Sequence, residues 1–294
     1  MKFTIFTPTF NRCSTLKRLY ASLLSQEFDN FEWILIDDGS TDETELFAKE
    51  VQSEKLIDLY YYKQENFGKQ YSYNKAISLS SSELFICVDS DDYLLPNCLL
   101  TLSNTWLNVS ENNVKDCAGI VFLDKHVSGE LIGTKLPLSV NYSNLYNLYN
   151  KFKVKGDKGL CFSTSILKMY QFPIFKDETF ITEAVLYNRI GSEYTLFCLN
   201  EALEVRDYQS DGLSSQSKEL MLNNPKGSAL YFNELLEVDS SYKANLIHSA
   251  KYCYYSIISH TNSKTILREA KIKKFIPLGY LIGLFFYFKN RFVS

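Results

Sequence analysis

Short apolar runs that end in acidic or polar turns recur within the first hundred residues, and they limit this chain to few folds. Residues 84–88 form one such run, and Asp89-Ser90-Asp91-Asp92 closes it. Residues 33–36 form another, which ends in Asp37-Asp38-Gly39-Ser40, and the N-terminal run stops at Thr7-Pro8-Thr9. Helical patterns separate the runs, so the alternation predicts an α/β fold with a parallel sheet. Ligands of open α/β sheets bind outside the carboxyl ends of the strands, where these turns are expected to lie.

The segment after the N-terminal run predicts a helix that is capped at its N-terminus by residues of the same segment. Asn11, Ser14 and Thr15 are residue types that can cap a helix. The expected apolar side of this helix consists of Leu16, Leu19, Tyr20, Leu23 and Leu24. A second helical pattern runs through residues 46–51, after the second acidic turn.

Three carboxylates crowd the turn at residues 89–92. Asp89, Asp91 and Asp92 raise one another's pKa and repel unless a cation binds between them. Mg²⁺ and Mn²⁺ favour oxygen ligands of this kind. The alternative is an ordinary surface turn, because Asp and Ser are common turn formers. For Asp92, capping of a following helix is a further alternative.

Together with their flanking motifs, these turns resemble the inverting family 2 glycosyltransferases of the GT-A fold, over roughly residues 1–215. The resemblance is to a bacterial branch that acts on cell-surface polysaccharides. It implies a Rossmann-like mixed sheet, mainly parallel and flanked by helices, and transfer of a hexosyl or N-acetylhexosaminyl group with inversion. The matching segments are Thr7-Pro8-Thr9-Phe10-Asn11-Arg12, Leu23-Leu24-Ser25-Gln26, Asp37-Asp38-Gly39-Ser40-Thr41-Asp42, Asn66-Phe67-Gly68-Lys69, Asn74-Lys75-Ala76, Asp89-Ser90-Asp91-Asp92 with Pro96, Phe180-Ile181-Thr182-Glu183 and Asp211-Gly212-Leu213-Ser214.

The resemblance implies roles for the acidic residues. Asp91 is expected to be the main ligand of a Mn²⁺ or Mg²⁺ ion that bridges the diphosphate of a nucleotide sugar. Asp89 either shares the metal or lies beside the ribose. Asp37 and Asp38 are expected to face the base and ribose, with Asp38 accepting a hydrogen bond from a uracil-like ring. The expected donor is therefore a UDP-sugar.

Six further residues are assigned to the donor site by the same resemblance: Thr7, Pro8, Thr9, Arg12, Lys69 and Ser90. The three N-terminal ones would supply backbone and side-chain edges for the base. Arg12 and Lys69 suit phosphate or ribose. Their alternative role is that of solvated surface cations, because Lys and Arg are mostly exposed.

Glu183 is the predicted catalytic base. An acceptor hydroxyl must lose its proton as it attacks the anomeric carbon, and a carboxylate can take that proton at neutral pH. Many members of the family carry Asp at this position, and Glu is one methylene longer. The alternative is an acid favoured by the dipole of the helix predicted to start at Ala184. Asp177 and Glu178 are the next candidates for the base.

After about residue 215 the sequence pattern changes from alternating strands and helices to helical runs. Residues 1–215 are predicted to form the catalytic domain, with a nucleotide-sugar half over about 1–125 and an acceptor half over about 126–215. Residues 216–294 are predicted to form a helical extension, in which residues 223–227 are a linker and residues 230–236 and 246–258 are helices.

The C-terminal tail is basic and aromatic. From Lys264 onward it holds seven basic residues and one acidic residue, a net charge of +6, which leaves −9 for the rest of a chain whose total is −3. Residues 275–288 form an apolar run of 14 residues, shorter than the ~20 that a helix needs to span a bilayer. Two interpretations remain open. The tail either anchors at the anionic inner face of the membrane or is a helix that packs on the catalytic domain or on a second subunit.

Composition narrows the remaining choices. The seven cysteines show no Cys-x-x-Cys spacing, which predicts free thiols in a reducing cytoplasm. No signal peptide is visible at the N-terminus. The net charge of −3 and the confinement of the excess positive charge to the tail argue against a nucleic-acid partner. Nicotinamide and P-loop motifs are also lacking, as is the glycine-rich loop of a nucleotidyltransferase.

The predicted function is therefore glycosyl transfer from a nucleotide sugar to a hydroxyl of a glycan or lipid-linked acceptor, in the cytoplasm or on the inner membrane face. The non-enzymatic alternative is a catalytically silent subunit that uses this fold to bind a glycan or a partner protein.

Overall fold

The computed structural model describes residues 1–112, 114, 116–209, 216–239 and 241–293, and the chain divides into two units. The first unit comprises Met1–Gln171 with Asn188–Ser210, and the second comprises Phe172–Tyr187 with Asp211–Ser294. The segment that carries Glu183 therefore belongs to the same unit as the C-terminal helices.

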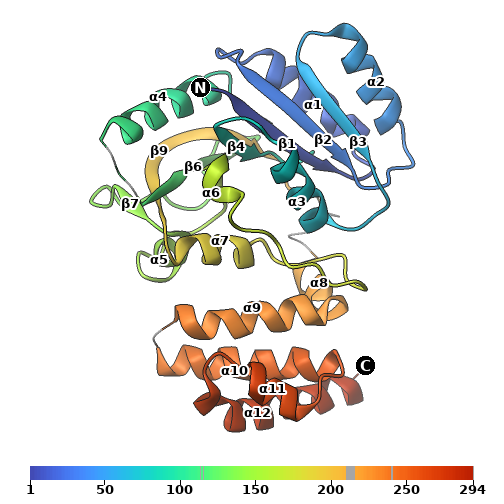
Figure 1. The fold of residues 1–294 in the computed structure, drawn as a ribbon, viewed down its shortest axis with the longest axis vertical. Helices are drawn as coiled ribbons and strands as arrows, with labels where there is room; N and C mark the ends of the chain where they lie inside the picture. The colour runs from blue at the N-terminus through green and yellow to red at the C-terminus, as the bar shows by residue number, and fades with distance from the viewer. Residues whose placement is uncertain (113, 115, 210–215, 240, 294) are drawn as a thin grey trace. The chain divides into compact units, whose positions relative to one another are not determined.

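The first unit is built on a sheet of nine described strands, in the order β3-β2-β1-β4-β8-β6-β9-β5, with β7 also paired to β9 (Figure 1). Strands β3, β2, β1 and β4 are parallel, as are β6 and β9. The other pairings are antiparallel. The predicted mixed α/β sheet is confirmed. The strands are β1 (Phe3–Thr9), β2 (Phe31–Asp37), β3 (Asp58–Lys63), β4 (Leu84–Cys87), β5 (Tyr93–Leu94), β6 (Cys117–His126), β7 (Tyr142–Ser143), β8 (Lys158–Ser163) and β9 (Thr195–Arg206).

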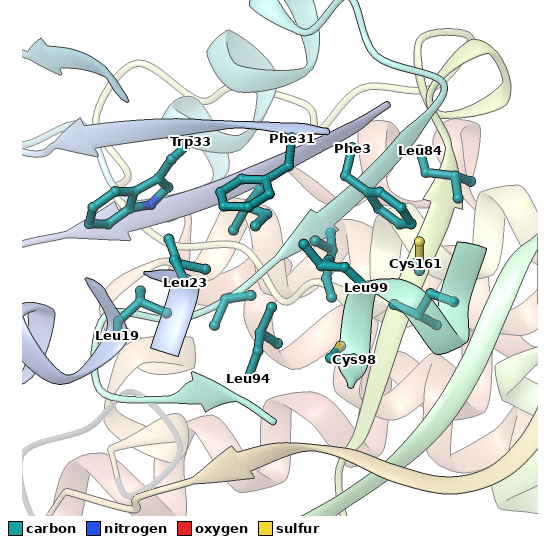
Figure 2. Close-up of a cluster of buried hydrophobic side chains, with 14 of the residues drawn as sticks. Phe3, Leu19, Leu23, Phe31, Trp33, Leu84, Leu94, Cys98, Leu99 and Cys161 are labelled. Atoms are coloured by element: carbon teal, nitrogen blue, oxygen red, sulfur yellow. The ribbon is translucent and has the colours of Figure 1, made fainter. Parts of the chain in front are cut away.

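Helices cover both faces of the central parallel strands, which explains why β1 and β2 are buried along almost their whole length. Phe3 and Ile5 lie in a hydrophobic core together with side chains of α1 and α4. Figure 2 shows part of this core, with side chains from the strands facing those from the helices. Phe6, on the opposite face, packs edge to face on Tyr73 of α3, with the ring centroids 5.3 Å apart. The helices are α1 (Cys13–Leu24), α2 (Thr44–Glu54), α3 (Lys69–Leu79), α4 (Cys98–Glu111), α5 (Leu145–Asn150) and α6 (Thr164–Leu167).

Helix α1 confirms most of the predicted apolar side but not its cap. Leu24 is exposed, whereas the other four predicted residues are buried. The N-cap residue Arg12 makes no side-chain capping bond. Asp42 Oδ2 instead accepts a hydrogen bond from the backbone N–H of Cys13 at 3.0 Å. The prediction of a local cap by Asn11, Ser14 or Thr15 is wrong, because the turn that follows β2 supplies this bond.

The second unit is helical. Helix α10 packs against both α9 and α12 (Figure 1). Phe232 of α9 stacks on Tyr255 of α10 at a centroid distance of 5.7 Å. The helices are α8 (Ser217–Asn223), α9 (Pro225–Val238), α10 (Tyr242–Ile258), α11 (Ser263–Glu269) and α12 (Ile276–Val293), with a 3₁₀ turn over Lys273–Phe275. Helix α7 (Ala184–Gly191) begins in this unit and ends in the first.

The predicted linker at residues 223–227 is wrong. Asn223 ends α8, Asn224 is the N-cap residue of α9, and Pro225 is its first residue. Proline suits this position because its fixed φ matches a helix and the first N–H needs no intrahelical acceptor. The two helices predicted over residues 230–236 and 246–258 are present as parts of α9 and α10.

The tail packs on α10 through two glycines of α12. A Cβ atom on Gly279 would lie 2.5 Å from Ser249 Oγ, and one on Gly283 would lie 2.8 Å from the backbone N of Tyr254. Asn290 Nδ2 donates to Tyr254 OH at 2.9 Å farther along α12. The tail helix therefore packs within the helical extension itself, whereas the packing interpretation had named the catalytic domain or a second subunit.

Within the described residues, no helix is both long enough and apolar enough to cross a membrane. Each of the seven cysteines is a free thiol, as predicted.

Candidate functional site

The acidic turns meet at the carboxyl ends of the parallel strands in the first unit. The sheet register pairs Thr9 with Asp37 and Phe6 with Cys87, so β1, β2 and β4 end at one edge. The backbone N–H of Asp38 donates to Thr9 O at 2.8 Å and joins the first two strand ends directly. The turns therefore lie at the carboxyl ends of neighbouring strands, as predicted.

Asp89 is paired with Lys69, the first residue of α3. Lys69 Nζ lies 2.5 Å from Asp89 Oδ1, and both side chains are largely shielded from solvent. Burial opposes ionisation of Asp89, but Lys69 and Arg206 outweigh it and hold the pKa of this carboxyl below its ordinary value. Lys69 is therefore the ion-pair partner of Asp89 rather than a solvated cation, and its contact with phosphate or ribose stays a prediction.

Asp91 is held through its backbone carbonyl, which accepts from a side chain of α1. Arg18 Nη2 of α1 donates to Asp91 O at 2.5 Å, while Arg18 Nη1 donates to Asp207 Oδ2 at 2.7 Å. Burial, followed by repulsion from Asp89, raises the pKa of the Asp91 carboxyl, against the opposing effects of Arg12 and Lys69. A further positive charge beside Asp91 would relieve this cost.

Asp92 anchors the turn to the residues at the end of β9. Its Oδ2 accepts from Arg206 Nη1 at 3.1 Å, and its Oδ1 accepts from the backbone N–H of Asp207 at 2.9 Å. Burial raises the pKa of Asp92 to about 7, although Arg206 opposes the shift. The helix-cap alternative for Asp92 is wrong, because β5 follows it and α4 begins only at Cys98.

Arg206, at the end of β9, is the centre of a buried charge cluster that the sequence did not reveal. Its Nε donates to Asp124 Oδ2 at 2.6 Å, and its Nη2 lies 3.4 Å from Glu204 Oε1. Burial raises the pKa of Glu204 well above its ordinary value, against the attraction of Arg206. Glu204 stands between the buried apolar residues Leu203 and Val205, and this charge within a strand was the available signal.

Asp37 and Asp38 are bound within the protein. Asp37 is fully buried, and its two oxygens accept from the backbone N–H of Ser40 and from Tyr61 OH, each at 2.7 Å. Asp38 accepts from Gln64 Nε2 at 2.9 Å and from the backbone N–H groups of Phe67 and Gly68 at 3.0 and 2.8 Å. Both carboxylates thus organise the loops around the strand ends, and their contact with a base or ribose stays a prediction.

The remaining donor-site candidates also lie at this edge. Thr7 Oγ1 accepts from Trp33 Nε1 at 3.0 Å, whereas the buried Thr9 hydroxyl has no hydrogen-bond partner among the described residues. Pro8 lies between them and is half-buried. Arg12 is half-buried at the start of α1, and its positive charge opposes the rise in the pKa of Asp91.

Ser90, the last donor-site candidate, is buried within the acidic turn itself.

Glu183 lies in the second unit and directly precedes α7, the helix that was predicted to start at Ala184. It is half-buried, and its carbonyl accepts from the backbone N–H of Tyr187 at 3.1 Å. The two other candidates for the base differ from it. Asp177 is exposed and lies 3.7 Å from Lys226 Nζ.

Glu178 is buried and binds the start of α9. Its oxygens accept from the backbone N–H groups of Lys226 and Gly227 at 2.6 and 2.8 Å. Asn224 Oδ1 accepts from the backbone N–H groups of Thr179 and Phe180 at 2.8 and 3.1 Å. The segment before Glu183 is therefore fastened to the helical extension. The motif Asp211-Gly212-Leu213-Ser214 lies outside the described residues.

Comparison with known proteins is consistent with this site. The family model "Glycosyl transferase family 2" matches residues 4–175. A curated relative from Campylobacter jejuni, GalNAc(5)-diNAcBac-PP-undecaprenol beta-1,3-glucosyltransferase, is 25% identical over 277 residues, which cover 91% of this chain and 86% of the relative.

Solved structures match the fold. TarS 1–349 of S. aureus, in complex with UDP-GlcNAc, superposes with a TM-score of 0.58 at 17% identity, covering 99% of this chain and 92% of that one. The mannosyltransferase PcManGT of Pyrobaculum calidifontis, in complex with GDP-Man and Mn²⁺, superposes with a TM-score of 0.56 at 13% identity, covering 96% and 87%. The predicted GT-A fold is confirmed.

Proposed function

The chain belongs to glycosyl transferase family 2, and from this premise we propose that it transfers a sugar from a nucleoside diphosphate donor to an acceptor hydroxyl, with inversion at the anomeric carbon. The observation that carries the proposal is the turn at residues 89–92. Arg18 and Arg206 hold this turn at the carboxyl end of β4, and Asp89 and Asp91 lie near enough within it for Asp89 to raise the pKa of Asp91.

Asp91 and Asp89 fit a divalent cation. The pKa of Asp91 is raised by burial and by Asp89, so a cation between the two would remove an existing repulsion. One or two carboxylates are a sufficient protein contribution for Mg²⁺ or Mn²⁺ when substrate phosphates complete the coordination. When bound, the ion would supply Lewis-acid stabilisation of the departing diphosphate.

A UDP-sugar is the proposed donor. The buried Thr9 hydroxyl, which has no partner among the described residues, would gain one from a bound base or ribose. Arg12 and Lys69 would lie near the phosphates. The nucleotides named for the structural relatives, UDP-GlcNAc and GDP-Man, belong to the same chemical class.

We propose Glu183 as the base. The acceptor oxygen would attack the anomeric carbon while its proton passes to a Glu183 carboxylate oxygen. The bond from the anomeric carbon to the diphosphate oxygen would break at the same time, and the nucleoside diphosphate would leave with that electron pair. A single displacement of this kind inverts the anomeric centre. Glu178 is unsuited to the role, because the backbone of α9 occupies both of its oxygens.

The proposed acceptor is a lipid-linked glycan of surface-polysaccharide assembly, reached from the cytoplasmic side of the inner membrane. The relative from Campylobacter jejuni, whose name includes an undecaprenol-linked glycan, supports this class.

The test is incubation of the full chain with a panel of nucleotide sugars and Mn²⁺, with free nucleotide measured over time. Slow hydrolysis of one donor is expected, and addition of lipid-linked glycans should accelerate it. A protein that binds no nucleotide sugar and releases no nucleotide with any of them would instead be a silent subunit.

A further inference from the structure

Helix α12 presents an exposed apolar face. Leu278, Leu281, Phe285 and Phe288 follow one another at helical spacing of three or four residues and so share one side of the helix. All four are exposed, and Leu281 and Phe285 are exposed by 64% and 62%. Exposed apolar residues grouped in this way mark an interaction surface more often than single ones do.

The opposite side of α12 is fixed in place. Gly279 and Gly283 let the helix approach α10 so closely that added Cβ atoms would meet Ser249 and Tyr254 at less than 3 Å. Phe275, just before α12, is buried and packs edge to face against Tyr242 at a centroid distance of 5.0 Å. The exposed face therefore belongs to a docked helix with a defined orientation on α10.

Basic residues lie before and within α12 in the sequence. The described ones are all exposed: Lys264, Arg268, Lys271, Lys273, Lys274 and Lys289. Glu269 is the single acid of the tail, and it pairs with Arg268 at 3.1 Å. Since the rest of the chain carries −9, the positive charge is concentrated in the same segment of the sequence as the apolar face.

We propose that this face of α12 docks on an anionic membrane surface, with its leucine and phenylalanine side chains in the headgroup boundary and the lysines of the same segment on lipid phosphates. Charge decides between the candidate occupants. A second copy of the chain would bring an equally cationic surface against this one, whereas anionic lipid complements both the charge and the apolar side chains. The proposal concerns attachment and does not depend on glycosyl transfer.

The experiment is co-sedimentation of the full chain with vesicles of phosphatidylcholine alone or mixed with phosphatidylglycerol. Binding is expected only to the anionic vesicles and should weaken with salt, because surface attraction is screened within a Debye length of ~8 Å at physiological ionic strength. The pair K273Q/K274Q should lower the affinity at least about tenfold, since each cation near an anionic surface contributes ~1 kcal/mol.

The pair L281S/F285S should likewise reduce binding about tenfold or more, because it removes two of the most exposed apolar side chains. Leu138→Ser, at an exposed leucine of the first unit, is the matched control and should bind normally. Circular dichroism and nucleotide binding should be unchanged in every variant.

Equal sedimentation with neutral and anionic vesicles, or wild-type binding by both variant pairs, would overturn the proposal. A lipid-free dimer that L281S/F285S converts to monomer would also overturn it and would assign the face to a second copy.

Discussion

The turn that carries Asp91 and the segment that carries Glu183 are held in place by different means. The turn at residues 89–92 is fixed by long cationic side chains, with Arg18 on the backbone of Asp91 and Arg206 on Asp92. The segment before Glu183 is fixed by neighbouring backbone groups, because Glu178 accepts from the first N–H groups of α9. The first belongs to the sheet unit and the second to the helical unit.

This difference implies that donor binding and sugar transfer can be disrupted separately. Changes at the turn act on charges that would bind the donor, whereas changes near Glu183 act on a segment that the C-terminal extension holds. Donor affinity and sugar transfer should therefore respond to different substitutions. The helical extension is then also part of what positions the proposed base.

Asp91→Ala should have the largest effect. Loss of the main proposed metal ligand should lower donor turnover by about 10³-fold and abolish the Mn²⁺ dependence of UDP binding, because the diphosphate charge would lose its compensating ion. Calorimetric titration of UDP with Mn²⁺ and with EDTA measures this directly. Asp58→Asn, at an exposed acid where β3 begins, is the control. Equal UDP affinity in EDTA and Mn²⁺ for the wild type would remove the metal from the mechanism.

Glu183→Gln should lower turnover by ~10²-fold and leave UDP affinity intact, since the amide keeps the shape of the side chain but cannot take the acceptor proton. Steady-state kinetics with the acceptor, alongside UDP calorimetry, would separate the two quantities. Asp177→Asn, at an exposed acid of the same segment, should be almost neutral. Near-normal turnover in Glu183→Gln would assign the base to another residue.

The sequence predicted β1, β2 and β4 and the turns that follow them, because both depend on local composition. An apolar run that ends in carboxylates already defines a strand end, and the sheet register confirms that these ends meet. Arg18 and Arg206 were missed because their partners are distant in sequence. Arg18 lies 73 residues from Asp91, and Arg206 lies 114 residues from Asp92. Only the folded sheet brings such cations onto the turn.

The two local errors have a common physical cause. Asn224 and Pro225 are typical of loops, but the same residue types favour the N-cap and first position of a helix, and α9 uses them there. At α1 the sequence offers local capping residues, yet a carboxylate from the next strand-end turn accepts the bond. In both places the choice depends on tertiary neighbours that a local pattern does not contain.

Glu178→Gln should have the smallest effect on turnover and is the sharpest test of the comparison. An amide can offer an oxygen to only one of the two N–H groups at the start of α9, so the segment before Glu183 should loosen. We expect a loss of about 1–3 kcal/mol in the free energy of unfolding and a roughly tenfold fall in turnover, because misplacing a catalytic group by a fraction of an ångström is costly. UDP affinity should not change. Chemical denaturation, kinetics and calorimetry on the same preparation give the three values, and Glu219→Gln, at an exposed acid of α8, is the matched control. A parallel fall in UDP affinity would show that α9 supports the whole molecule rather than the Glu183 segment, and unchanged turnover despite lower stability would remove the positioning role of the extension.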